Sequence, residues 1–226
     1  MGRHKKFEEY KDSIPQLVPK THNQELLIKA IEKHSIVLAI GPAGCGKTYV
    51  SAAMAANYFY NDYVDRIVLS RANIPTGRTL GHFPGTVEDK LTPWVTPSLD
   101  VLRKFLGDGK YQYAIDKKQI QLQPLETIRG RSFEHSFIII DEAQNLSVEE
   151  IISITTRLGE YSKLLLLGDP FQSDIKDQNG LVWFDEISKK YNLNIPVIHF
   201  SLDDVVRSKI VKDILVALYK EFKNHS

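Results

Sequence analysis

The stretch Gly41-Pro-Ala-Gly-Cys-Gly-Lys-Thr48 decides the fold of this chain. It fits the pattern G-x-x-x-x-G-K-[ST], in which backbone N–H groups surround phosphates, the lysine reaches the β- and γ-phosphates and the hydroxyl binds Mg²⁺. Taken alone, the pattern also fits an ordinary glycine turn. The residues that we expect to contact a nucleotide here are Gly41, Pro42, Ala43, Gly44, Cys45, Gly46, Lys47, Thr48 and Tyr49.

The residues on either side of this loop favour the phosphate-binding interpretation. Residues 35–40 are apolar and rich in β-branched side chains, and residues 49–60 are rich in alanine with no Gly or Pro. This is the strand, loop and helix context that the motif requires. The free N–H groups and the positive dipole end of the helix then point at the triphosphate.

A second strand is predicted at residues 137–140, and it ends in Asp141 and Glu142. In open α/β sheets, functional groups gather at the carboxyl ends of strands. We therefore expect Asp141 to hold Mg²⁺ and Glu142 to polarise the attacking water, the role that phosphoryl transfer requires. The alternative is a buried strand capped by an acidic turn.

A third apolar strand is predicted at residues 163–167, and the loop Gly168-Asp-Pro-Phe-Gln172 follows it. Gln172 can both donate and accept a hydrogen bond, so we expect it to sense the γ-phosphate or its attacking water. On its own this loop would be a common Gly-Asp-Pro turn.

The remaining pattern alternates strands with helices, which predicts an α/β fold. We expect one domain at residues 21–226 after an N-terminal arm at residues 1–20, with a doubly wound, mostly parallel sheet and helices on both faces. The stretch 71–112 has many Pro and Gly residues and is expected to be largely irregular. Strands are predicted at 36–40, 66–70, 119–123, 137–140, 163–167 and 195–200, and helices at 23–33, 47–60, 98–106, 148–157, 181–190 and 204–222.

These motifs together resemble a known family. Asp141-Glu-Ala-Gln-Asn145 with Gly168-Asp-Pro-x-Gln172 resembles superfamily 1 helicase cores, and residues 20–220 are similar to the PhoH family of P-loop ATPases. Segments 77–85, 129–133 and 204–207 match as well. The resemblance implies a RecA-like P-loop NTPase fold with ATP and Mg²⁺ as cofactors.

Two further site residues are implied by this resemblance alone. Gln24 stands where such proteins contact adenine, although it could be a solvated helix residue. Arg207 stands where the family places an arginine near the nucleotide, in cis or from a neighbouring subunit, and there it would neutralise transition-state charge. The alternative for Arg207 is a surface residue paired with Asp203 or Asp204.

Composition limits the possible settings. The chain has 226 residues, 42% of them hydrophobic and 25% charged, and one cysteine. No apolar run is long enough to span a membrane, no Cys or His spacing suggests zinc, and a single cysteine suits a reducing cytoplasm. With one RecA-like domain, motor action would require a partner or a homo-oligomer, such as a hexameric ring.

The region 66–131 is the expected nucleic-acid face. It carries 11 Lys+Arg against 6 Asp+Glu, although the whole chain has a net charge of only +1. A basic face suits a phosphate backbone, and aromatic side chains can stack on unpaired bases, but solubility or packing of the loop on the core would explain the same residues. The candidates are Arg71, His82, Phe83, Lys90, Trp94, Arg129 and Arg131.

Two functions fit these features. The first is ATP hydrolysis coupled to single-stranded nucleic acid, with RNA favoured over DNA by the family resemblance, by an oligomeric helicase. The second is an assembly module that ATP orders, with slow turnover. A kinase fits poorly, because Asp141-Glu142-Ala143-Gln144 indicates water as the acceptor.

Overall fold

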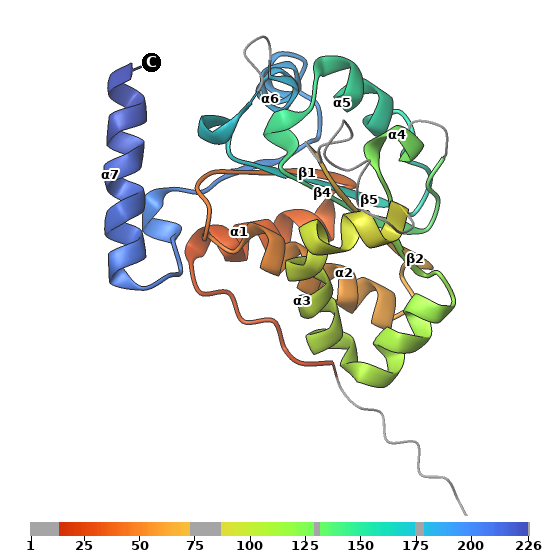
Figure 1. Ribbon diagram of the computed structural model, residues 1–226. Helices are drawn as coiled ribbons and strands as arrows, with labels where there is room; N and C mark the ends of the chain where they lie inside the picture. Colours follow the sequence, from red (N-terminus) through yellow and green to blue (C-terminus); the bar gives the residue numbers. More distant parts are fainter. Residues whose placement is uncertain (1–13, 73–86, 129–131, 175–178, 226) are drawn as a thin grey trace, which may run out of the picture.

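A computed structural model describes residues 14–72, 87–128, 132–174 and 179–225. Its centre is a six-stranded sheet with the strand order β3-β2-β4-β5-β1-β6 (Figure 1), and every neighbouring pair is parallel. The strands are β1 (Ile36–Ile40), β2 (Arg66–Arg71), β3 (Ile120–Leu122), β4 (Ser136–Asp141), β5 (Lys163–Gly168) and β6 (Val197–His199).

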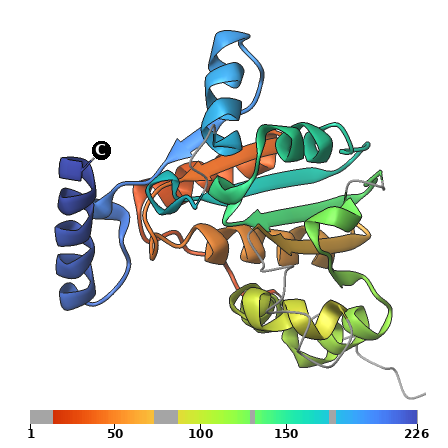
Figure 2. The same cartoon turned by 45° about the horizontal axis from the view of Figure 1, so that its top comes forward.

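Helices cover both faces of this sheet. In Figures 1 and 2, α1, α2 and α3 lie on one face, α5 and α6 lie on the other, and α7 stands at the edge. Among the described residues, no helix is both long and apolar enough to cross a bilayer. The helices are α1 (His22–Lys33), α2 (Lys47–Tyr60), α3 (Val87–Asp116), α4 (Leu125–Ile128), α5 (Val148–Thr155), α6 (Gly180–Lys190) and α7 (Lys209–His225), with 3₁₀ turns η1 (Ala143–Asn145), η2 (Pro170–Gln172) and η3 (Leu202–Asp204).

Each central strand sends alternate side chains to two separate cores. Val37 and Ala39 of β1 pack with the buried residues of α1, α2 and α3, whereas Leu38 and Ile40 pack with those of α5 and α6. A strand buried on both faces has no polar alternation, and this explains why the sequence shows continuous apolar runs. The predicted doubly wound α/β domain is confirmed, and its sheet is wholly parallel.

Strand β5 separates β1 from β4. Ile36 of β1 lies opposite Leu164, and Phe137 of β4 lies opposite Lys163. The register continues until Ile40 lies opposite Gly168, and the Gly41 N–H donates to the Gly168 carbonyl at 3.0 Å. The phosphate loop and the loop after β5 therefore leave the sheet at the same level.

The prediction that the stretch 71–112 is largely irregular was wrong for most of its described residues. Helix α3 begins at Val87, includes Pro93 and Pro97, and departs from helical geometry only at Gly107, where φ is 74°. Buried side chains of this helix, such as Leu102 and Phe105, pack into the same core as α2. This apolar packing outweighs the weak helix propensity of proline and glycine. Residues 73–86 lie outside the described residues.

Other predicted boundaries also moved. Strands β3 and β6 are three residues each, shorter than the predicted 119–123 and 195–200. The helix predicted from residue 204 begins at Lys209, because Asp204 belongs to η3. The Asp204 carboxylate accepts from the Ser201 N–H (2.9 Å) and the Asn23 side-chain amide (2.7 Å), so it closes a turn before α7 begins.

We predict that Phe137→Ala lowers the free energy of unfolding by about 3–5 kcal/mol, because Phe137 is fully buried in β4 and its removal leaves a cavity. Urea denaturation of the two proteins measures this difference. The control is Tyr113→Ala, an exposed position on α3, where a change within about 0.5 kcal/mol is expected. Equal effects at the two positions would contradict this packing.

Candidate active site

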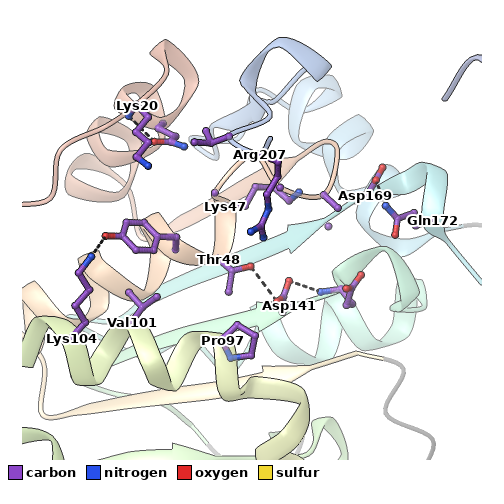
Figure 3. A pocket seen from close by; sticks show the side chains of 18 of the residues that line it. Lys20, Lys47, Thr48, Pro97, Val101, Lys104, Asp141, Asp169, Gln172 and Arg207 are labelled. Carbon is purple, nitrogen blue, oxygen red and sulfur yellow. Dashed lines mark hydrogen bonds between the residues drawn. The ribbon is translucent and has the colours of Figure 1, made fainter. Parts of the chain in front are cut away.

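A cavity of about 600 Å³ opens at the carboxyl edge of the sheet, between the phosphate loop and α3 (Figure 3). This volume suits a nucleotide-sized ligand. The cavity brings together all four predicted catalytic residues, Lys47, Glu142, Gln172 and Arg207, from four separate segments. Other lining residues include Gln24, Ala43, Gly44, Gly46, Thr48, Tyr49 and Asp141.

Two glycines of the phosphate loop have no room for a side chain. Gly41 has φ 145°, and a Cβ there would lie 2.4 Å from the Phe200 carbonyl oxygen. Gly46, which caps α2, has φ 83°, and a Cβ would lie 2.6 Å from Gln24 Nε2. The motif therefore needs glycine at these positions for close packing of the loop as well as for its backbone conformation.

Lys47 is buried at the start of α2. Its ammonium donates to the carbonyl oxygens of Gly41 (2.6 Å) and Pro42 (2.8 Å). Burial lowers the pKa of Lys47 because desolvation penalises the charged form. An anionic ligand beside the loop would restore a full charge partner to this ammonium.

Thr48 and Asp141 meet across the intervening strand, since the Thr48 hydroxyl donates to Asp141 Oδ2 at 3.2 Å. Burial, and then the negative charge of Glu142, raise the pKa of Asp141. A desolvated carboxylate next to a hydroxyl is a hard oxygen donor set of the kind that Mg²⁺ prefers. These two residues therefore fit the predicted magnesium site.

Glu142 is held by two neighbours and by its backbone. Its Oε1 accepts from Arg71 Nη2 at 2.8 Å and its Oε2 accepts from Gln144 Nε2 at 2.6 Å. The residue has φ 55°, a left-handed conformation that is uncommon outside glycine and that concentrates at functional sites. Its carboxylate therefore has a fixed direction at the cavity wall.

One predicted nucleic-acid residue, Arg71, contacts Glu142, and a second, Trp94, contacts Arg71. Besides its bond to Glu142, Arg71 donates to the Trp94 carbonyl oxygen at 3.2 Å, and its guanidinium lies 5.7 Å from the centre of the Trp94 ring. Arg71 thus links β2, β4 and α3 at the edge of the cavity. Of the other candidates, His82, Phe83, Arg129 and Arg131 lie outside the described residues, and Lys90 lies on α3.

Gln24 is not the solvated helix residue that was the alternative, because it is only 4% exposed. Its Nε2 donates to the Cys45 carbonyl oxygen at 2.9 Å, and its Oε1 accepts from the Lys20 N–H at 2.8 Å. Both ends of the amide therefore hold the backbone of this chain. In this arrangement Gln24 supports the phosphate loop from the side of α1.

Arg207 lies over the phosphate loop of its own chain. The neighbouring Val206 N–H donates to the Gly44 carbonyl oxygen at 3.0 Å, and a Cβ on Gly44 would lie 3.0 Å from Arg207 Cγ. In Figure 3 the Arg207 side chain points toward Thr48 and Asp141. The surface pairing that was the alternative is absent among the described residues, since Asp203 pairs instead with Lys212 at 3.8 Å.

Comparison with known proteins agrees with this geometry. The family description "PhoH-like protein" matches residues 16–219. The chain belongs to the PhoH family. It is 35% identical over 209 residues to a PhoH-like protein of Synechocystis, covering 92% of this chain and 63% of that protein. It is 33% identical over 215 residues to Protein PhoH of Escherichia coli, covering 92% and 59%. The chain thus spans about three-fifths of the length of these relatives.

A solved structure with a similar fold is the UvsW helicase from bacteriophage T4, with a TM-score of 0.51 and 14% identity. The match covers 84% of this chain and 64% of that one. The PhoH family and this fold make the chain a P-loop NTPase with a RecA-like core. The predicted membership of the PhoH family and the predicted fold class are both confirmed.

Several residues that complete the PhoH-type cavity were not predicted. Pro97, Val101 and Lys104 come from α3, and the Lys104 ammonium donates to the Tyr49 hydroxyl at 3.1 Å. The sequence predicted a helix at 98–106, which includes Val101 and Lys104, but no signal placed that helix along the cavity. Gln144 was quoted only as part of a motif, yet its side chain joins two site loops: Nε2 donates to Glu142 and Oε1 accepts from the Asp169 N–H at 3.0 Å.

We predict that Asp141→Asn raises the melting temperature at pH 7.5 in EDTA. Because the folded-state pKa of Asp141 is raised, its contribution to stability is full below the ordinary value of about 4 and is lost as pH rises through the folded value. At pH 7.5 the buried charge therefore destabilises the metal-free fold, and asparagine removes it. Thermal melts measure the shift.

The matched control is Asp100→Asn, an exposed carboxylate on α3. This variant should have the same melting temperature as the wild type at pH 7.5. A wild type more stable than Asp141→Asn in EDTA would contradict a destabilising buried charge at Asp141.

Proposed function

We propose that this chain hydrolyses ATP with Mg²⁺. The observation that carries the proposal is the cavity itself, in which the phosphate loop faces Asp141, Glu142, Gln172 and Arg207. A nucleotide kinase would need an acceptor site for a second substrate, whereas here a carboxylate with two hydrogen-bonded neighbours faces the same space. That arrangement suits water as the acceptor.

Positive charge is supplied to the phosphates from both sides of the cavity. The N–H groups of the loop and the start of α2 surround the phosphates, and Lys47 reaches the β- and γ-phosphates. Arg207, above Gly44, neutralises the charge that grows on the transferred phosphoryl group. Thr48 and Asp141 would hold Mg²⁺, which would neutralise phosphate charge.

The attacking water is oriented by Glu142. Its carboxylate accepts hydrogen bonds from Arg71 and Gln144, which fix its direction and leave lone pairs for a water proton. Gln172 lines the same cavity and can detect the γ-phosphate or the water. Positioning by such groups accounts for most of the catalysis in phosphoryl transfer.

We further propose that hydrolysis is coupled to single-stranded nucleic acid in the cytoplasm, with RNA favoured over DNA. The charge excess of residues 66–131 supports this, and α3 adds the Lys104 ammonium to the wall of the cavity. A strand bound along α3 could act on Glu142 through Trp94 and Arg71, which are in contact. Helicase activity would use this coupling.

Helix α7 supports a homo-oligomer, such as a hexameric ring. Its exposed apolar side chains include Ile210, Ile214 and Leu218, one helical turn apart, so they form a stripe that suits another protein surface. The same stripe supports the second candidate function, a nucleotide-gated assembly module with slow hydrolysis and no coupling to nucleic acid.

Steady-state ATP hydrolysis with Mg²⁺, with and without single-stranded RNA and DNA, tests the proposal. We predict that Glu142→Gln lowers kcat by at least about a hundredfold while ATP still binds, because only the base is lost. Faster hydrolysis in the presence of RNA supports the enzyme coupled to nucleic acid. Turnover that depends on Glu142 but is unchanged by RNA and DNA supports the assembly module. Equal turnover by Glu142→Gln would contradict the role of Glu142.

We predict that Arg207→Ala lowers kcat by about a thousandfold and that it does so in cis. Mixing Arg207→Ala protein with Glu142→Gln protein should restore no activity, because each subunit then lacks one essential group of its own site. Hydrolysis assays across mixing ratios measure this. Recovery of activity in the mixture would show that the arginine acts across a subunit boundary.

A further inference from the structure

Tyr219 joins the C-terminal helix to the hydrolytic site without lining the cavity. It lies on α7, is only 7% exposed, and its hydroxyl donates to Asp169 Oδ2. The ring of Phe171 packs edge-on against it, with centroids 5.1 Å apart. Burial and the bond to Asp169 raise the pKa of Tyr219, so its hydroxyl remains a proton donor at every working pH.

The Asp169 carboxylate connects Tyr219 to the loop that follows β5. Its carboxylate is buried and accepts from Gln172 Nε2 at 2.7 Å on the same Oδ2 that Tyr219 contacts, and from the Phe171 N–H at 3.2 Å on Oδ1. One oxygen atom is therefore shared by Tyr219 and Gln172. The orientation of the Gln172 amide depends on where Tyr219 holds that oxygen.

A second branch continues from Asp169 to Glu142. The Asp169 N–H donates to Gln144 Oε1 at 3.0 Å, and Gln144 Nε2 donates to Glu142 Oε2 at 2.6 Å. Gln144 is almost fully buried, so its amide cannot exchange these partners for water. Tyr219 and Glu142 are thus joined by a path of three hydrogen bonds, which crosses Asp169 from its carboxylate to its backbone N–H and then crosses the Gln144 amide.

We propose that Tyr219 is a positioning residue for hydrolysis, and that it acts through Asp169 on Gln172 and, through Gln144, on Glu142. The inference rests on the proposed ATP hydrolysis and extends it, because it makes the seating of α7 a condition for turnover. The phosphate contacts of residues 44–48 are outside this chain of bonds. Loss of the hydroxyl should therefore affect the chemical step and leave nucleotide affinity unchanged.

Tyr219→Phe tests this, since it removes one oxygen and keeps the ring that packs on Phe171. We expect kcat to fall about tenfold, with KM and the affinity for a fluorescent ATP analogue unchanged. Tyr191→Phe, at an exposed tyrosine after α6, is the matched control and should behave as wild type. A kcat equal to that of wild type in Tyr219→Phe would overturn the inference.

The pair Tyr219→Phe and Gln172→Ala separates positioning from general stability. Because Tyr219 acts partly through Gln172, the double variant should lose less kcat than the product of the two single losses, whereas independent effects would multiply. Multiplied effects would overturn the inference. If Tyr219→Phe does not fold, Asp169→Asn replaces it, because asparagine keeps one accepting oxygen and cannot serve all three donors that the two carboxylate oxygens serve. An unchanged kcat in that variant overturns the inference equally.

Wild-type turnover separates this inference from the function on which it rests. If the wild type does not hydrolyse ATP, the proposed function fails and the inference fails with it. If the wild type hydrolyses ATP and Tyr219→Phe matches it, only the inference fails.

Discussion

All six strands run in the same direction, and the position of every functional loop follows from this constraint. In a parallel sheet, each carboxyl end lies at the same edge, so the segments that follow β1, β4 and β5 converge. Neighbouring strands lie about 4.8 Å apart, so the phosphate loop and Asp141, separated by β5, are roughly 10 Å apart at the sheet. Thr48 closes this gap from the first turn of α2.

The sequence revealed the parts of the site that short-range patterns encode. The loop at Gly41 to Thr48 and the runs of β4 and β5 are continuous segments with a distinct composition, and the structure brings them together as expected. Only residues 98–106 of helix α3 were predicted as helix, because local propensity argues against a helix that contains Pro93, Pro97 and Gly107, whereas packing on α2 favours the longer helix. Helix propensities describe each residue by itself and do not include the packing contacts that the folded chain makes.

Side-chain partners were the least predictable part for the same reason. Gln24 was expected at a base, yet its amide holds the backbone at Lys20 and Cys45, and Arg71 was expected on a nucleic-acid face, yet it holds Glu142. These bonds join residues far apart in the chain. Residue type and spacing show that such groups are present, and only the fold determines which partner each one meets.

The order of the strands has a consequence for how this protein is made. Strand β1 has two neighbours in the sheet, β5 and β6, and both follow it by more than half the length of the chain. A ribosome therefore releases the phosphate loop long before β5 and β6 can pair with β1. Pairing between strands so distant in the sequence is slow, and until it occurs the apolar strand edges stay exposed. Nucleotide can stabilise only a chain that already includes β5 and Arg207, so binding follows these contacts and cannot guide the early steps of folding.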